Sequence, residues 1–145
     1  MPVDGRRKRH AKLKMPAQKN PRLFVYGTLR KQVKHPTHQI LARHGSYIGM
    51  GVFQGRLYNL GRYPGAVASA EKSDRVIGEV YELEPNTQAF EILDDYEGRL
   101  FSREPTTIFL DTGETITSWI YLYRGVVEER RRIVSGDYLA YLDQP

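Results

Sequence analysis

The sequence contains no cysteine. This absence excludes disulfides, thiol nucleophiles and cysteine-based metal sites, and it favours a reducing, cytoplasmic compartment. There is also no run of about 18 apolar residues, so we expect no membrane-spanning helix, and no apolar segment is typical of a signal peptide. The 145 residues are enough for one domain with a hydrophobic core of its own.

Acidic residues are scarce at the N-terminal end. Residues 1–20 contain seven of the 22 Lys and Arg residues but only one of the 17 Asp and Glu residues. Residues 21–145 therefore hold 15 basic and 16 acidic side chains and are nearly neutral, although the net charge of the whole chain is +5. We expect a basic disordered tail over 1–20 and a folded domain over 21–145. The tail is either a solvated extension, upstream of a true start at Met15, or an arm that contacts polyanions weakly.

After the tail, the pattern is mainly that of β-strands. The predicted strands are 22–26, 46–60 as one bent strand or a hairpin, a short strand within 61–69, 75–83, and a hairpin over 101–123. Two helices are predicted, one over 37–45 and one that starts at Pro85, runs to about Tyr96 and is stopped by Gly98. The end of the chain, 135–142, is predicted to be a loop and a terminal segment.

Several glycines lie inside the predicted strands, and the chain has ten tyrosines. The glycines permit strong bends, and tyrosines supply apolar bodies with polar tips for a pocket wall. The predicted class is α+β: a small curved β-barrel of about six strands with flanking short helices.

Two patterns suggest cofactor sites but do not have the required context. The stretch "GMGVFQG" places Gly49, Gly51 and Gly55 within a predicted strand, whereas a pyrophosphate-binding loop must open a helix. His35 and His38 are close in sequence but have no third ligand nearby, so we expect no metal site. We expect no other cofactor.

The second predicted helix carries four carboxylates: Glu91, Asp94, Asp95 and Glu97. At about 100° per residue, Glu97 alone among them falls between apolar residues, Leu93 and Phe90. Burial and the negative end of the helix dipole would both favour the neutral acid, so we expect its pKa to rise towards the range useful for proton transfer. In the alternative, the last turn unwinds and Glu97 is solvated or pairs with Arg99 or Arg103.

The stretch "FVYGTLR" ends a predicted strand on a Gly-Thr pair. The amides of Gly27, Thr28 and Leu29 are then left without partners in the sheet, and a glycine lets a ligand approach the main chain closely. Successive free amides can bind an anion or a carbonyl oxygen, and the Thr28 hydroxyl can add a hydrogen bond. Taken alone, the stretch is also explained by an ordinary turn that ends a strand.

Five separated motifs occur in order: "FVYGTLR", "YPGAV", "LDDYEGRLFSR", "WIYLY" and "SGDY". Together they resemble the γ-glutamylcyclotransferase-like family, most closely its short γ-glutamylamine cyclotransferase branch, over residues 22–142. The resemblance implies a small β-barrel with flanking helices, and it implies that Glu97 is the catalytic acid and base. The residues that it implies for substrate binding are Tyr26, Gly27, Thr28 and Leu29. Some relatives have serine where this chain has Thr28.

The implied reaction closes the α-amine of a γ-glutamyl compound onto its own γ-carbonyl group. It releases 5-oxoproline and an amine or amino acid, and it needs no metal or cofactor. The partner is then a small-molecule γ-glutamyl substrate, whose leaving amine the sequence leaves open, as it does the oligomeric state. The alternative is a non-catalytic small-molecule-binding or interaction module on the same fold.

Overall fold

The computed structural model describes residues 20–30, 38–85 and 88–144. Residues 1–19 of the predicted tail, including Met15, and also His35 lie outside the described residues. Within the described ranges, no helix is long and apolar enough to cross a membrane.

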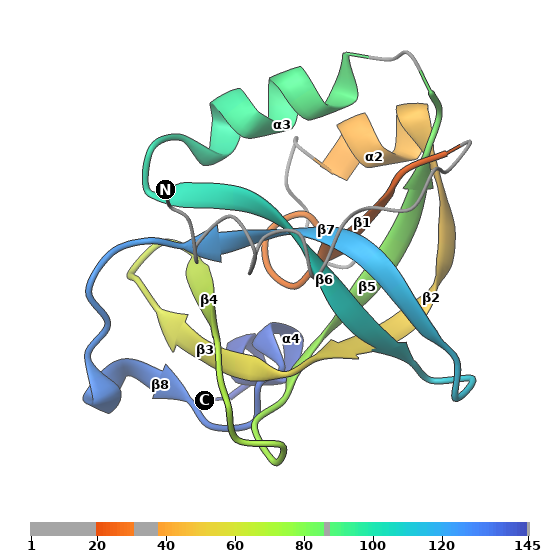
Figure 1. The fold of residues 1–145 in the computed structure, drawn as a ribbon. Helices are drawn as coiled ribbons and strands as arrows, with labels where there is room; N and C mark the ends of the chain where they lie inside the picture. The colour runs from red at the N-terminus through yellow and green to blue at the C-terminus, as the bar shows by residue number, and fades with distance from the viewer. Residues whose placement is uncertain (1–19, 31–37, 86–87, 145) are drawn as a thin grey trace, which may run out of the picture.

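Five strands of the described chain close into a barrel (Figure 1). In order around the barrel they are β1 (Arg22–Val25), β5 (Val76–Leu83), β2 (Gly45–Phe53), β6 (Phe101–Leu110) and β7 (Thr115–Tyr123). Parallel pairing of β1 with β7, with Leu23 beside Trp119, closes the ring, and the other pairs are antiparallel. The predicted α+β class and small curved barrel are confirmed, with five strands in the barrel where about six were predicted.

A second sheet lies beside the barrel. Within the described chain its strands are β4 (Pro64–Ala68), β3 (Gly55–Asn59) and β8 (Arg132–Ile133), in that order. The segment 46–60 therefore divides at Gln54 between the barrel and this sheet, and the hairpin alternative for it is wrong. Gly55 permits the bend, because a Cβ there would collide with the ring of Phe53 and the carbonyl oxygen of Val67.

Two helices, α2 (His38–His44) and α3 (Ala89–Glu97), lie side by side against the barrel (Figure 1). The helix predicted over 37–45 is confirmed as α2. The glycine that was predicted to end it, Gly45, is the first residue of β2.

Helix α3 differs from its prediction at the start and agrees at the end. The predicted start at Pro85 is wrong, since Ala89 is the first helical residue; it is fully buried together with Leu93, and these two residues fix which face packs inward. The predicted stop at Gly98 is confirmed. Gly98 has a φ of +76°, a conformation that favours glycine, so the helix ends directly after Glu97.

The C-terminal end forms a helix where a loop and terminal segment were predicted. After a short 3₁₀ helix, η1 (Glu129–Arg131), and β8, the chain forms α4 (Tyr138–Leu142). The side chain of Asp137 accepts hydrogen bonds from the amides of Leu139 and Ala140 and so caps this helix. The prediction is corrected here because a capping aspartate is enough to begin a helix of one to two turns.

The core has two parts, which lie on opposite faces of the barrel wall. Phe24 and Val80 belong to the cluster inside the barrel, whereas Leu23 and Val25 belong to the cluster between the barrel and the helices α2 and α3. Alternate residues of a strand point to opposite faces, so β1 is held by apolar contacts on both sides. Each fully buried side chain of this size contributes roughly 1.5–3 kcal/mol relative to an exposed one. The end of β1, from which the next loop starts, is therefore fixed in position.

Candidate active site

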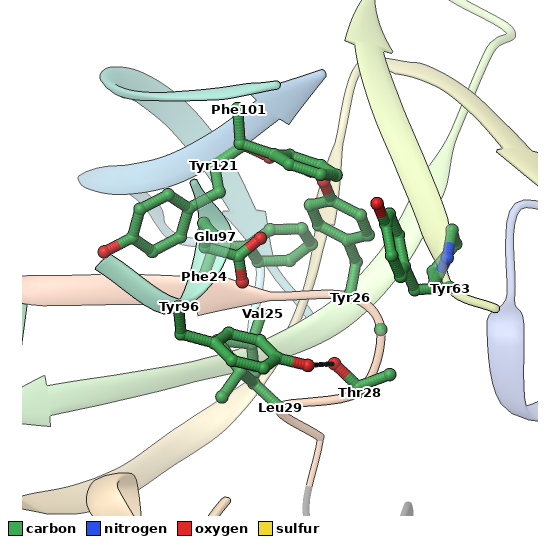
Figure 2. A pocket seen from close by; sticks show the side chains of 12 residues that line it. Phe24, Val25, Tyr26, Thr28, Leu29, Tyr63, Tyr96, Glu97, Phe101 and Tyr121 are labelled. Atoms are coloured by element: carbon green, nitrogen blue, oxygen red, sulfur yellow. Dashed lines mark hydrogen bonds between the residues drawn. The ribbon is translucent and has the colours of Figure 1, made fainter. Parts of the chain in front are cut away.

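A pocket lies where the loop after β1 faces the end of α3 (Figure 2). Its cavity is about 130 Å³, well above the ~10–15 Å³ that one water molecule requires, so a small organic group can enter. The described residues that line it are Phe24, Val25, Tyr26, Gly27, Thr28, Leu29, Tyr63, Pro64, Tyr96, Glu97, Phe101 and Tyr121. Four of them are tyrosines, which confirms the predicted pocket wall of apolar bodies with polar tips.

Glu97 is the last residue of α3, and its carboxylate lies among the aromatic rings of the pocket (Figure 2). Among the described residues it has no hydrogen-bond or ion-pair partner. Burial raises the pKa of Glu97 to about 7, and the negative charge of Asp94 adds to the shift. Glu97 is half-buried, and the direction of its pKa shift agrees with the prediction. A carboxyl group with this pKa can both accept and donate a proton near neutral pH.

Asp94, one turn before Glu97, pairs with Arg103, the cation that could otherwise neutralise Glu97. Arg103 donates to the two carboxylate oxygens of Asp94 at 2.8 and 3.1 Å, and the Tyr121 hydroxyl donates to Oδ1 at 2.6 Å. Burial acts to raise the pKa of Asp94, but these hydrogen bonds and the charge of Arg103 lower it overall. Within the described chain, Glu97 pairs with neither Arg103 nor Arg99, so that alternative is wrong.

The loop after β1 closes as a turn, in which the Arg30 amide donates to the Gly27 carbonyl oxygen at 3.0 Å. The amides of Thr28 and Leu29 belong to residues of the pocket wall and have no hydrogen-bond partner within the described residues. Successive unpaired amides of this kind can bind an anion or a carbonyl oxygen of a ligand. The Thr28 hydroxyl lies 3.3 Å from the Tyr96 hydroxyl, which joins the loop to the last turn of α3 (Figure 2).

The packing around position 27 explains why it is a glycine, and the sequence did not indicate this reason. A Cβ at this position would lie 2.7 Å from Cγ of Pro64, which is itself part of the pocket wall. We expected a ligand to approach Gly27 closely. On the side of the missing Cβ, however, the ring of Pro64 occupies that space. A side chain at Gly27 would therefore displace another wall of the same pocket.

Tyr26 contributes its ring to the pocket, and its hydroxyl is already used by the protein. The hydroxyl donates to the Tyr121 carbonyl oxygen at 2.5 Å and accepts from the Ala66 amide at 3.2 Å. Burial, followed by the charge of Glu97, raises the pKa of the Tyr26 phenol, so it stays protonated. Tyr26 thereby ties β4 and β7 to the start of the loop.

Comparison with known proteins decides the family. The family described as γ-glutamyl cyclotransferase, AIG2-like, matches residues 23–140, which include both the loop and Glu97. The chain belongs to the γ-glutamylcyclotransferase family. A provisionally named γ-glutamylcyclotransferase of Methanocaldococcus jannaschii is 32% identical over 124 residues, covering 82% of this chain and 96% of that protein. A γ-glutamylcyclotransferase family protein of Escherichia coli is 33% identical over 118 residues, with coverages of 81% and 96%.

Solved structures of other proteins have the same fold. YkqA of Bacillus subtilis is similar with a TM-score of 0.67 and 29% identity; the match covers 84% of this chain and 40% of that longer chain. A mouse AIG2-like protein is similar with a TM-score of 0.66 and 23% identity, covering 83% of this chain and 89% of that one. The fold of the γ-glutamylcyclotransferase family is thus present from the first strand to the C-terminal helix.

The structure brings all five predicted site residues of this family member into one pocket: Glu97, Tyr26, Gly27, Thr28 and Leu29. Sequence reasoning did not assign the aromatic and proline wall opposite them, formed by Tyr63, Pro64, Phe101 and Tyr121. Tyr63, Pro64 and Tyr121 lie in the motifs "YPGAV" and "WIYLY", which contributed to the family resemblance but were assigned no role in substrate binding. Sequence reasoning also assigned no role to Asp94 next to Glu97.

Proposed function

We propose that this protein is a γ-glutamyl cyclotransferase that releases 5-oxoproline and an amine or amino acid from a γ-glutamyl compound, with Glu97 as general acid and base. One observation carries the proposal. A partly buried carboxyl group with a pKa of about 7 shares a pocket with two unpaired backbone amides. Family membership and the names of the relatives support the same enzyme class.

In this proposal the loop after β1 holds the glutamyl part of the substrate. Among the described lining residues, Glu97 alone carries a formal charge at neutral pH, so a carboxylate of the substrate finds no cationic side chain there. The amides of Thr28 and Leu29 and the Thr28 hydroxyl are the donors for its α-carboxylate or its γ-carbonyl oxygen. Gly27 keeps this turn close to the opposite wall, and the ring of Tyr26 packs against the apolar part of the substrate.

The proposed reaction begins when Glu97 accepts a proton from the α-ammonium group. The freed α-amine nitrogen attacks the γ-carbonyl carbon, which forms the five-membered ring and places the negative charge on the carbonyl oxygen. The bond from that carbon to the leaving nitrogen then breaks as the carbonyl double bond re-forms, and Glu97 returns its proton to the departing nitrogen. The ring nitrogen still carries two hydrogens at this point, and it loses one of them as a proton to solvent to become the lactam N–H. One carboxyl group thus accepts and donates the same proton, and the products are 5-oxoproline and the free amine.

The tether between the nucleophile and the carbonyl group accounts for much of the catalysis. Both groups belong to one molecule, so the enzyme has to fold the substrate into a cyclic conformer and does not have to bring two molecules together. A snug aromatic wall favours such a folded conformer over an extended one. The amides of the loop would stabilise the oxyanion if they face the γ-carbonyl oxygen.

The test is incubation of the protein with a panel of γ-glutamyl compounds and detection of 5-oxoproline. The panel contains glutathione, γ-glutamyl amino acids, γ-glutamyl-ε-lysine and γ-glutamyl derivatives of simple amines. We expect 5-oxoproline from at least one member, and γ-glutamyl-ε-lysine or a simple amine derivative would place the activity in the γ-glutamylamine branch. No 5-oxoproline from any member, together with binding of one of them, would instead indicate the non-catalytic binding module.

A further inference from the structure

The loop after β1 has an anchor at each end. At its start, the Tyr26 hydroxyl is held by the Tyr121 carbonyl oxygen and the Ala66 amide. At its end stands Arg30, a charged residue of which only 3% is exposed. Between the two anchors are Thr28 and Leu29, whose amides have no partner within the described residues.

Arg30 is held by two carboxylates from different parts of the fold. Its Nε donates to Oε2 of Glu79, on β5, at 3.1 Å, and its Nη1 donates to Oδ1 of Asp137, ahead of α4, at 2.9 Å. Glu79 is 1% exposed and also accepts from the Tyr81 hydroxyl at 2.9 Å. The guanidinium is thus bound from two directions, which fixes its orientation as well as its position.

Arg30 also takes part in the turn through its main chain. The Arg30 amide closes the turn by donating to the Gly27 carbonyl oxygen at 3.0 Å. Only Thr28 and Leu29 lie between these two residues, so a shift of Arg30 moves both unpaired amides. The neighbouring Leu29 is buried in the apolar cluster between the barrel and the helices α2 and α3, and this packing also holds the backbone of the turn.

Stability alone gives little reason for an ion pair at this place. Taking two charges out of water has a large free-energy cost. Replacing a buried ion pair by well-packed hydrophobic residues of similar volume often leaves the stability unchanged. What such a pair supplies is a defined geometry. We propose that Arg30 is a positioning residue, held by Glu79 and Asp137, that keeps the Thr28 and Leu29 amides aligned on the substrate. This inference rests on the proposed function, because it needs a substrate group that these amides bind.

The probe is 5-oxoproline, the product that every candidate substrate would release. Its affinity is measured by calorimetric titration for the wild-type protein, for Arg30→Met, and for Arg30→Met combined with Glu79→Gln. The double variant removes the ion pair with Glu79 without leaving an unpaired charge in the buried position, while Asp137, the second partner of Arg30, is partly exposed to solvent. Methionine has no donor group, so it cannot replace the hydrogen bonds that Arg30 donates. The matched control is Arg22→Met with Glu82→Gln, a partly exposed pair at 3.7 Å that joins β1 to β5 away from the loop.

We expect the dissociation constant for 5-oxoproline to rise at least about tenfold in both Arg30 variants, as for the loss of one hydrogen bond to a charged group. The double variant should recover most of the melting temperature that Arg30→Met loses, while its affinity stays low. With the best substrate of the panel, KM should rise more than kcat falls, and the pH dependence of kcat should stay that of the wild type. The control pair should change none of these quantities.

Two results would overturn the inference. If affinity returns together with melting temperature in the double variant, Arg30 contributes only to folding. If the folded Arg30 variants bind 5-oxoproline like the wild type, the loop does not depend on it. A wild-type protein that neither binds nor produces 5-oxoproline would refute the proposed function itself, and the inference with it.

Discussion

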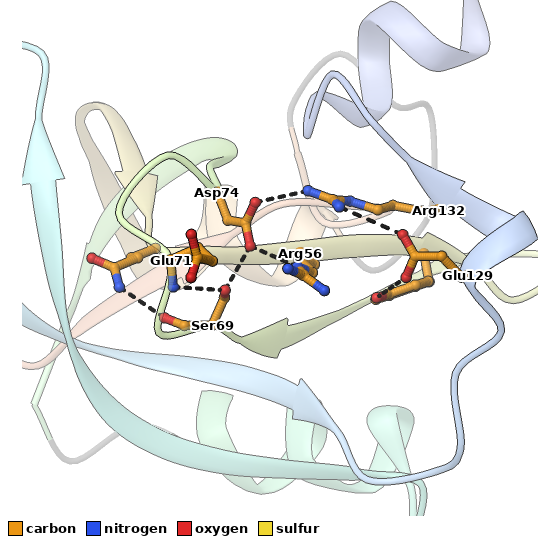
Figure 3. A network of polar contacts seen from close by, with 8 residues as sticks. Arg56, Ser69, Glu71, Asp74, Glu129 and Arg132 are labelled. Atoms are coloured by element: carbon orange, nitrogen blue, oxygen red, sulfur yellow. Dashed lines mark hydrogen bonds and ion pairs between the residues drawn. The ribbon is translucent and has the colours of Figure 1, made fainter.

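Two carboxylates of this protein lie in opposite surroundings. Glu97, in the pocket, has no partner among the described residues, and burial raises its pKa to about 7. Asp74 follows the second sheet's β4 and is surrounded by donors (Figure 3). Hydrogen bonds from Ser69 and then Arg56 lower the pKa of Asp74 to about 2. The same chemical group is thus only partly ionised at neutral pH in one region and fully ionised in the other.

The donors around Asp74 come from separate parts of the second sheet. Ser69 Oγ and Arg56 Nε each donate to Oδ2 at 2.6 Å, and Arg132 Nη2 donates to Oδ1 at 2.8 Å. These contacts join the turn after β4 to β3 and β8, and Arg132 also lies 3.5 Å from Glu129 (Figure 3). A carboxylate with every partner supplied joins elements of the fold, whereas one left unpaired in a pocket is available for chemistry.

The largest expected effect is that of Glu97→Gln on activity. Glutamine keeps the size and the hydrogen-bonding capacity of the side chain, but it cannot carry a proton between two groups at neutral pH. Production of 5-oxoproline should fall by at least the ~10²-fold typical of losing a general base, while the melting temperature should not decrease. Assays of turnover and thermal unfolding on the same preparation check both statements.

Asp95→Asn is the control for that variant, since Asp95 is exposed on the same helix. Asp94→Asn is not a neutral control, although the helical wheel placed Asp94 on the polar face, because Arg103 and Tyr121 both donate to it. Near-normal turnover of Glu97→Gln, or an equal loss in Asp95→Asn, would remove Glu97 from the mechanism.

The next effect is expected at Gly27. In Gly27→Ala, the new Cβ meets the ring of Pro64 on the opposite wall, so substrate affinity and stability should both decrease. We expect kcat/KM to fall by about tenfold, the size of one lost hydrogen bond to a charged group. Adding Pro64→Ala creates room for the methyl group and should restore the melting temperature at least in part. If Gly27→Ala alone behaved like the wild type in turnover, the turn would be more tolerant than this packing allows.

Asp74→Asn should show the reverse pattern of Glu97→Gln. The melting temperature at pH 7 should drop by several degrees, because Arg56 and Arg132 lose their shared anion, while turnover stays within about twofold. The pKa of Asp74 is about 2, below its ordinary value of 3.8, so its contribution is complete above that ordinary value and is lost as the pH falls through about 2. Denaturant unfolding at a series of pH values should therefore show the two proteins converging in acid. A constant difference at all pH values would contradict this account.

The smallest effect is expected from the N-terminal tail. Deletion of residues 1–20 should leave turnover and melting temperature unchanged, because the family motifs begin after it and the remaining domain is nearly neutral. A clear drop in either quantity would show that the tail contacts the domain. Comparing the full and truncated chains on a heparin column tests the separate prediction of weak polyanion contact.

Sequence patterns predicted the parts of the fold that depend on local rules. The strands and the hairpin over 101–123 follow from alternation and turn residues, and the end of α3 follows from Gly98. The division of 46–60 between two sheets could not be read from the pattern, because it depends on which distant strands pair with each half. The helix α4 could have been predicted from the sequence, since Asp137 is a typical N-cap residue.

The candidate site shows the same limit. The helical wheel placed Glu97 correctly because its neighbours lie on the same helix. The bond of Tyr26 to Tyr121, and the packing of Pro64 on Gly27, join residues far apart in the chain, and no local rule indicates them. Sequence therefore placed Glu97 and the loop after β1 in the pocket and missed the wall that faces them.

The most direct measurement is the pKa of Glu97 itself, from a pH titration of its side-chain carboxyl carbon followed by NMR, with Glu97→Gln to assign the signal. We predict a midpoint near 7, against 4.5 for an ordinary glutamate. Because the folded protein then binds this proton more tightly than the unfolded chain, wild-type stability should decline relative to Glu97→Gln as the pH rises from about 4.5 to 7. A midpoint near 4.5, with parallel stability curves for the two proteins, would contradict the account.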